Sequence, residues 1–293
     1  MAYWYPLMAV LIWAANTVVS KAAAAVIDPA AISLYRWLIA ALVLTPLLLP
    51  QLLRHWAQIR QDWAKFSVLA LLGMVLYQSL AYFAAHSTSA TNMGVICALI
   101  PLLGLLLNTI LFRFRPTLAA IIGALLSFSG VVYLLGQGNP LAVLAAGINL
   151  GDGLMLLGAS AYALYGILLR RWALPYGHWL NLYVQILLGV VLLLPVAATA
   201  KTLVVVPQAW VLLLFAGIAS SILASFCWMQ GVQRLGSERA AIFMNLLPLF
   251  TALIAVLVLN EQLQHFHYLG GGAILAGVLL VQLAQWRPAS RPG

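Results

Sequence analysis

Two residues in the first apolar stretch, Trp13 and Asn16, are of types that could contact a small molecule. They stand three positions apart, and residues at this spacing are neighbours on one face of a helix. An amide near the centre of an apolar helix is costly unless it finds a partner. We therefore expect the pair either to contact a ligand that carries a ring or a carboxylate, or to pack and hydrogen-bond against a neighbouring helix.

Two cations, Lys21 and Arg36, lie within apolar stretches on either side of Asp28. Each is about five residues, or roughly 7 Å of helix, from the end of its stretch. This distance is short enough for the charge to reach the membrane surface. The alternatives are that the cations attract a carboxylate ligand, or that one of them pairs with Asp28.

Two prolines, Pro101 and Pro248, stand in the middle of apolar stretches. Proline removes a backbone hydrogen bond and bends a helix, and the carbonyl that it frees can face a cavity. We predict a kink with a gating role at each proline, with simple packing geometry as the alternative. Asn245, three residues before Pro248, is predicted to face the same cavity.

Aromatic side chains are frequent in the third, sixth and eighth apolar stretches. An aromatic lining suits an amphipathic or apolar metabolite, although packing is the more common role of any single ring. The rings predicted to line a substrate cavity are Tyr77, Tyr82, Tyr162, Tyr165 and Trp228.

Patterns that would support catalysis or a bound cofactor do not occur. The five acidic residues all fall between the apolar stretches or at their ends, which disfavours proton exchange through a carboxylate inside the membrane. Among them, Glu261 is predicted to be an interface or capping residue. No phosphate-binding glycine loop of the ATPase type is present, and His265 and His267 share no helical face on which to bind a metal. We therefore expect no catalysis, no metal and no cofactor.

Composition places these residues in a membrane. Of the 293 residues, 65% are hydrophobic and 6% are charged, whereas about a quarter of an average soluble domain is charged. The roughly 190 apolar residues suffice for about nine or ten helices of about 20 residues, the length that crosses a bilayer. The alternating pattern typical of a membrane barrel is absent. The sequence therefore predicts an all-α integral membrane protein.

Prolines, glycines and charged residues divide the chain into ten predicted transmembrane helices. They cover residues 4–26, 31–49, 66–86, 91–112, 117–136, 153–169, 179–198, 209–233, 239–260 and 266–286. The net charge is +9, and the basic residues of the loops fall after even-numbered spans or in the tail, except Lys201. Because basic loops remain in the cytoplasm, both termini are predicted to be cytoplasmic. This scattered distribution favours membrane orientation over nucleic-acid binding.

The two halves of the sequence resemble each other at an offset of 147 residues. The shared markers are a Pro-Leu pair and two glycines, which place Pro101 on Pro248, Gly123 on Gly270 and Gly130 on Gly277. Because five spans are an odd number, the second half must cross the membrane in the opposite direction. Inverted repeats are the architecture of secondary transporters, whose substrate site lies where the halves meet. We predict a first five-helix repeat (1–136), a connecting loop (137–150), an inverted second repeat (151–286) and a cytoplasmic tail (287–293).

Several of these motifs are those of a known family. Trp13-Ala-Ala-Asn16 is similar to a Trp-Gly-x-Asn pattern, Arg36 matches a frequent arginine, and the Pro-Leu pairs and Asn260-Glu261 also match. On these residues the sequence resembles the EamA family of the drug/metabolite transporter superfamily over nearly its whole length. The resemblance implies a ten-span inner-membrane exporter of small metabolites, often amino acids. The chain differs from the family pattern at Ala14, where Gly is usual, and at Arg113-Phe-Arg115, the first-half counterpart of the acidic residue.

Together these features predict a secondary transporter that exports small organic metabolites, amino acids or related compounds, by alternating access without ATP hydrolysis. One alternative is a lipid or lipid-carrier flippase, in which Lys21 and Arg36 would hold a headgroup. Another is a membrane assembly subunit with no transport activity. The expected partners are a small-molecule substrate and the lipid bilayer, with no nucleic acid, for a monomer or a homodimer.

Overall fold

All regular elements in the described part of the chain are helices. The structure, a computed structural model, describes residues 2–113, 115–141 and 148–285. The predicted cytoplasmic tail (287–293), the last residue of the tenth predicted span and residues 142–147 of the predicted connecting loop lie outside these ranges. The prediction of an all-α membrane protein is confirmed.

Within the described ranges, nine helices are long and apolar enough to cross a membrane, and a helix pair bent by 43° raises the number to ten if it forms one span. The first half contains α1 (Trp4–Ala23), α2 (Pro29–Gln61), α3 (Trp63–Leu69) continued by η1 (Ala70–Leu76) and α4 (Tyr77–Ala84), the bent pair α5 (Ala90–Cys97) and α6 (Ile100–Phe112), and α7 (Leu118–Leu135). The second half contains α9 (Leu150–Trp172), α10 (His178–Ala197), α11 (Ala209–Leu214) continued by η2 (Phe215–Leu223) and α12 (Ala224–Leu235), α13 (Ser237–Ile242) continued by η3 (Phe243–Leu246) and α14 (Leu247–Leu259), and α15 (His265–Gln285). Each predicted span therefore coincides with a helix or with a continuous set of helices.

Four helices, α2, α5, α7 and α9, begin at residues whose side chains accept a hydrogen bond from a free backbone N–H group. Asp28 accepts a hydrogen bond from Ala30 N at the start of α2, and Pro29, which has no N–H to satisfy, occupies the first turn. Ser89 caps α5 and Thr117 caps α7 in the same way. These polar caps separate helices whose interiors are apolar.

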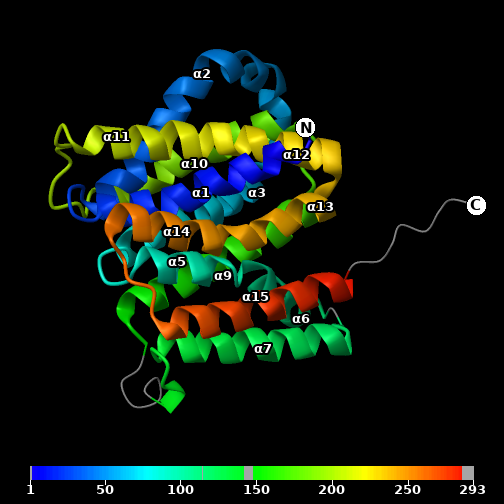
Figure 1. The fold of residues 1–293 in the computed structure, drawn as a ribbon. Helices are drawn as coiled ribbons and strands as arrows, with labels where there is room; N and C mark the ends of the chain where they lie inside the picture. Colours follow the sequence, from blue (N-terminus) through cyan, green and yellow to red (C-terminus); the bar gives the residue numbers. More distant parts are fainter. Residues whose placement is uncertain (1, 114, 142–147, 286–293) are drawn as a thin grey trace, which may run out of the picture.

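The second span was predicted to end before Pro50, and this helix end is wrong. Helix α2 continues to Gln61, with Pro46 and Pro50 inside it. A proline removes its own backbone hydrogen bond and bends the helix, but the helix can resume beyond it. Figure 1 shows α2 as an arch over the top of the molecule. At 1.5 Å per residue, its 33 residues would extend about 50 Å, which exceeds the roughly 30 Å of a bilayer core.

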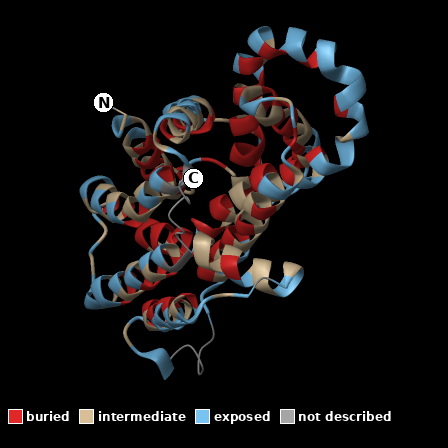
Figure 2. Ribbon diagram, turned by 90° about the vertical axis from the view of Figure 1, so that its right-hand side faces the viewer, coloured by how far each residue is buried: buried red, intermediate tan, exposed pale blue. Residues whose placement is uncertain are grey.

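Large apolar side chains cover the outer faces of the helices. Leu118 on α7 is 73% exposed and Leu257 on α14 is 71% exposed. In Figure 2 buried residues lie mainly on the faces that helices turn toward one another, whereas the arch of α2 is largely exposed. Exposed apolar helix faces combined with internally satisfied backbone groups are what a lipid environment requires.

Element boundaries repeat at the offset found in the sequence. Helices α6 and α14 both have 13 residues and start 147 positions apart, at Ile100 and Leu247. Both end in a left-handed residue of nearly the same conformation, Arg113 with φ 54° and Asn260 with φ 55°. Helices α7 and α15 also begin 147 positions apart. The secondary structure thus carries the same internal correspondence as the sequence.

Helices α7 and α15 make reciprocal contacts along one line. Gly123 of α7 faces the carbonyl oxygen of Gly277, and Gly130 faces that of Gly270. Between these contacts, Ser127 Oγ donates a hydrogen bond to Ile274 O (3.1 Å), and these two residues are themselves 147 positions apart. Reciprocal contacts of this kind are expected where two elements pack around a two-fold axis. Figure 1 shows the pair side by side at the bottom of the molecule.

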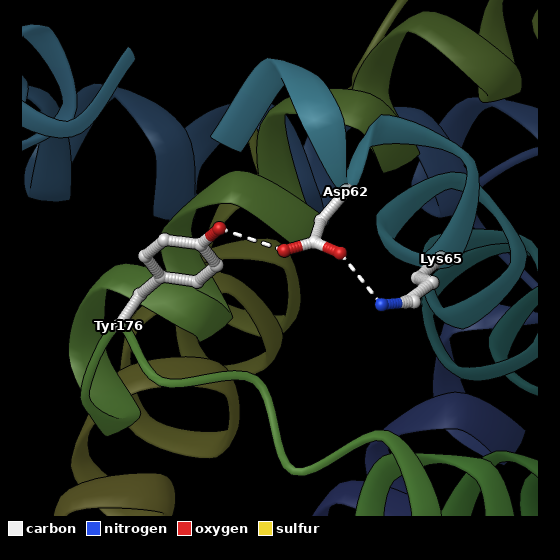
Figure 3. A network of polar contacts seen from close by, with 3 residues as sticks. All are labelled: Asp62, Lys65 and Tyr176. Carbon is white, nitrogen blue, oxygen red and sulfur yellow. Dashed lines mark hydrogen bonds and ion pairs between the residues drawn. The ribbon is translucent and has the colours of Figure 1, made fainter. Parts of the chain in front are cut away.

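Contacts between loops define two ends of the bundle, which we name after Asp28 and Asp62. At the Asp28 end, Lys201 N donates to Asp28 Oδ2 (3.0 Å), and Lys21 Nζ donates to Ala85 O (2.7 Å). At the Asp62 end, Tyr176 OH donates to Asp62 Oδ2 (2.7 Å; Figure 3). The chain segments after the first, third and seventh spans thus meet at one end and those after the second and sixth spans at the other, as alternating crossings require.

The Asp62 carboxylate also accepts from Lys65 Nζ at 2.7 Å (Figure 3). The hydrogen bonds from Lys65 and Tyr176 hold the pKa of Asp62 below its usual value. Partial burial and the neighbouring carboxylate raise the pKa of Tyr176 to about 12. The carboxylate therefore ties the loop after α2 to the loop after α9 whenever it is ionised.

Candidate functional site

Arg36 lies inside the helix bundle and is only 2% exposed. Its guanidinium donates hydrogen bonds to four side-chain oxygens, all of them uncharged. The acceptors are Gln78 Oε1 (2.6 Å) and Tyr82 OH (3.2 Å) for Nη1, Ser220 Oγ (3.1 Å) for Nη2 and Ser221 Oγ (2.9 Å) for Nε. The predicted site residues Arg36 and Tyr82 are therefore in direct contact.

Among the described side chains, no carboxylate lies within 4 Å of the Arg36 guanidinium. The ion pair in the described part of the chain joins Lys65 to Asp62, in a different region of the structure. Neutral oxygens satisfy the N–H groups but do not cancel the charge. A buried cation without a counter-charge costs several kcal/mol. Such an arrangement favours an anionic group that arrives from outside, and carboxylates and phosphates are the groups that a guanidinium binds through two parallel hydrogen bonds.

Both halves of the chain build this network. Arg36 comes from α2 and Gln78 and Tyr82 from α4, whereas Ser220 and Ser221 come from the π-helix η2. Ser221 Oγ donates its proton to Ala216 O (2.8 Å), five residues back along the π-helix. Its lone pairs are then free to accept from Arg36. The network therefore joins the first half of the chain to the second.

Trp13 joins the same region. Its indole Nε1 donates to Ser220 O (3.2 Å), and its ring centroid lies 5.5 Å from that of Trp228 on α12. Asn16, one turn further along α1, is 8% exposed, and its Oδ1 is buried without a hydrogen-bond partner. Lys21 instead lies at the Asp28 end, where it binds Ala85 O. Trp13, Arg36, Tyr82 and Trp228 are thus brought together around η2.

A row of tyrosines runs beside this network. Tyr77 on α4 lies 4.5 Å from Tyr162 on α9, and Tyr162 lies 5.3 Å from Tyr165, measured between ring centroids. The Tyr77 hydroxyl also contacts Cys97 Sγ at 3.4 Å. Gly73 leaves room for the Tyr165 ring, because a Cβ there would lie 2.9 Å from it. The row therefore leads from the centre of the bundle along α9.

The two prolines mark changes of helix rather than smooth kinks. Pro101 occupies the first turn of α6, directly after the 43° break from α5. Pro248 occupies the first turn of α14, which follows the 3₁₀ segment η3. Asn245, within η3, donates through Nδ2 to Gln282 Oε1 of α15 (3.0 Å). The structure thus places Asn245 against α15 and not in the Arg36 network.

Two sequence segments, residues 1–136 and 149–283, match the EamA-like transporter family. The chain belongs to this family. Among EamA relatives, an uncharacterized transporter of Archaeoglobus fulgidus is 29% identical over 284 residues, covering 95% of this chain and 96% of the relative. The uncharacterized transporter YyaM of Bacillus subtilis is 27% identical over 227 residues, covering 76% of this chain and 74% of the relative. Family and relatives indicate a membrane transporter and not an enzyme.

A solved crystal structure has the same fold as this EamA chain. The two superpose with a TM-score of 0.65 at 20% identity, covering 96% of each chain. At this identity the likeness concerns the fold alone. The resemblance to the EamA family inferred from the motifs is confirmed, and these relatives leave the substrate open.

Glu261 of the EamA chain closes α14 onto the first half. Its carboxylate accepts from Ala90 N (2.7 Å), Thr91 N (3.1 Å) and Thr91 Oγ1 (2.7 Å) at the start of α5. The prediction of a capping residue is confirmed. A negative charge here also suits the positive end of the α5 dipole.

Sequence reasoning missed Ser220 and Ser221 as partners of the arginine. Gln78 is a polar residue in an apolar span, but nothing in the sequence ranks it above other amides in such spans. The adjacent serines at the centre of the eighth span were the available signal. Serine is common in membrane helices because it can bond to its own backbone, so the pair carried little information before Arg36 was placed.

Proposed function

We propose that this EamA-family protein is an alternating-access secondary transporter that exports small organic metabolites bearing a carboxylate, such as amino acids, without ATP hydrolysis. In this proposal residues 1–136 and 151–286 form two inverted repeats around one substrate site. Both termini lie in the cytoplasm, and the protein resides in the inner membrane. Arg36 binds the carboxylate, while Trp13, Asn16 and the tyrosine row contact the rest of the substrate.

The observation that carries this proposal is the buried Arg36 whose partners are all neutral. A purely structural arginine at this depth would be expected to have a carboxylate beside it. Here the four accepting oxygens come from α4 and from η2, so both halves of the chain hold the guanidinium. A substrate carboxylate that displaces some of these oxygens changes how the halves are held together. Binding is thereby linked to the change of access.

The reciprocal packing of α7 and α15 supports the inverted-repeat part of the proposal. Two halves related by an axis in the membrane plane can close either side of a shared site. A cavity of about 530 Å³ at the Asp28 end, lined by Asp28, His86, Lys201 and neighbouring residues, suits the outward exit of such a pathway.

The test is flux of labelled amino acids and related carboxylates from proteoliposomes. We expect Arg36→Gln to reduce flux of carboxylate substrates by at least tenfold, since a charge-assisted hydrogen bond contributes about 1.5–3 kcal/mol. The matched control Arg54→Gln changes an exposed arginine on the same helix and is expected to keep wild-type flux. Protein-dependent flux of labelled lipid in place of metabolites would establish the flippase alternative. Absence of flux for the whole panel would contradict transport of small carboxylates.

A further inference from the structure

A second cavity, of about 240 Å³, lies where α9 ends and α10 begins. Its lining consists of Tyr165 and Leu169 from α9, Ala173 and Leu174 from the connection, and His178, Asn181, Leu182 and Gln185 from α10. The connecting segment carries Tyr176, which binds Asp62 at 2.7 Å (Figure 3). The cavity therefore belongs to the Asp62 end of the bundle, away from the one beside Asp28.

Two amide oxygens at this cavity have no hydrogen-bond partner. Gln185 is 1% exposed, and its Oε1 is buried and unpaired. Asn181, one turn earlier on α10, leaves its Oδ1 buried and unpaired as well. A buried polar atom without a partner costs about 1–3 kcal/mol. Two such atoms on one wall of a cavity indicate a place for a ligand that supplies donors.

The polarity of both amides is fixed by their other contacts. Gln185 Nε2 donates to Asn181 O (3.0 Å), and Asn181 Nδ2 donates to Leu174 O (3.0 Å). Backbone carbonyls only accept, so rotating either amide would place two oxygens against each other. The unpaired atoms are therefore acceptors, and their ligand must donate N–H or O–H groups.

The remaining walls favour a positive donor group on a compact apolar body. Tyr165 contributes an aromatic face, which attracts a cation, and Leu169 and Leu182 contribute apolar surface. An ammonium group, with three donors and a positive charge, satisfies both oxygens together.

We propose that this cavity binds a primary ammonium group through Asn181 Oδ1 and Gln185 Oε1. The role of this cavity in transport rests on the function proposed above. The tyrosine row from Tyr165 to Tyr77 connects the cavity with the centre of the bundle. We infer that the cavity is a loading site for substrates that carry an amine. Binding itself requires no transport. The substrates are thereby narrowed from carboxylates in general to compounds that also bear a primary amine.

The experiment is calorimetric titration of the purified full-length protein in nanodiscs with n-butylammonium. Tetramethylammonium, which has the charge without N–H donors, and butan-1-ol, which has a single donor without the charge, serve as comparison ligands. We expect saturable binding of n-butylammonium to the wild type and at least tenfold weaker binding of both comparison ligands. In Gln185→Leu the binding of n-butylammonium should be about tenfold weaker, because one charge-assisted hydrogen bond is lost. The matched control Gln58→Leu makes the same change at an exposed position and should bind as the wild type does.

A second variant, which is expected to bind more tightly, excludes misfolding as the sole explanation of weaker binding in Gln185→Leu. Asn181→Asp places a carboxylate on the same wall and is expected to strengthen n-butylammonium binding by about tenfold. The proposal is overturned if the wild type shows no saturable binding, if tetramethylammonium binds equally well, or if Asn181→Asp gives no increase. These results concern binding at the α9–α10 cavity, so they are separate from the flux result for Arg36→Gln, and either proposal can fail while the other stands.

Discussion

Replacing one glycine of the α7–α15 contact tests whether the two helices are held backbone to backbone. In Gly270→Ala the new Cβ would lie 2.9 Å from Gly130 O and 3.2 Å from Leu134 Cβ. Ordinary contacts of this kind begin near 3.4 Å, so the helices must separate by about 0.5 Å, which forfeits about a quarter of the dispersion energy along the contact. Overpacking of this size costs about 1–3 kcal/mol.

Gly272→Ala on the same helix is the matched control, because a Cβ there meets no atom within 4 Å. It should stabilise the protein by up to about 1 kcal/mol through helix propensity alone. The free energy of unfolding of Gly270→Ala is therefore expected to lie about 1–3 kcal/mol below that of the control. Thermal unfolding in detergent should show this as a difference of roughly 2–4 °C in Tm for each kcal/mol.

Gly123→Ala, at the position equivalent to Gly270, is expected to lower the free energy of unfolding by about the same amount. A Cβ at Gly123 would lie 2.6 Å from Gly277 O. If Gly270→Ala unfolds at the temperature of Gly272→Ala, the close approach of α7 and α15 is refuted. If Gly123→Ala alone is damaging, the two-fold relation between the helices is refuted.

Three further perturbations address single contacts. Ala173→Gly should raise the Tm, because Ala173 has φ 42° and the left-handed conformation costs a residue with a Cβ roughly 1–2 kcal/mol. Glu261→Gln should lower the stability by about 0.5–2 kcal/mol and speed hydrogen exchange of the Ala90 and Thr91 amides that Glu261 caps. Tyr176→Phe removes a hydrogen bond that lowers the pKa of Asp62, so that pKa should rise. A carboxyl with a lowered pKa stabilises the fold above its unfolded pKa, and this stabilisation is lost as pH falls from the unfolded pKa to the folded pKa. The acid loss of stability should therefore be smaller in Tyr176→Phe and complete at a higher pH, as measured by Tm against pH.

Two of these changes have a control variant on the same chain, and Glu261→Gln is checked by the exchange of the amides that it caps. Ala57→Gly, in the exposed part of α2, should lower the Tm where Ala173→Gly raises it, and a loss in both would contradict the strain at Ala173. Unchanged exchange at Ala90 in Glu261→Gln would show that the cap contributes nothing. Tyr268→Phe, at an exposed tyrosine, should leave the dependence of Tm on acid pH unchanged. If it changes that dependence as much as Tyr176→Phe does, the effect of Tyr176→Phe does not come from the pKa of Asp62.

The spans were predictable because a run of about 20 apolar residues has one stable solution in a bilayer. Their boundaries followed from residues that cap helices, such as Asp28 and Ser89. The end of α2 was not predictable from Pro50, because a proline decides only its own hydrogen bond. Whether the helix resumes depends on what the next residues contact, and here Leu52 and Ile59 are buried beyond the bend.

Partners across helices could not be read from the chain. Trp13, Arg36 and Tyr82 stood out singly because each is unusual in an apolar run, and the structure brings them together. Asn245 stood out equally, yet its amide binds Gln282 on α15. An amide inside a membrane must find some partner, and the sequence does not say which of two helices supplies it.

The hydrogen bonds that Glu261 forms with the start of α5 restrict where the helix bundle can open. Separating α14 from α5 would leave Ala90 N and Thr91 N without their acceptor among apolar neighbours. Because an unpaired buried N–H group is costly, we expect these two helices to stay together. Across the bundle, by contrast, the loop after α1 and the loop after α10 are joined by a single exposed hydrogen bond, from Lys201 N to Asp28, beside the 530 Å³ cavity. On the export pathway proposed above, release would therefore proceed past Asp28 and Lys201, with the contact between α14 and α5 as the hinge.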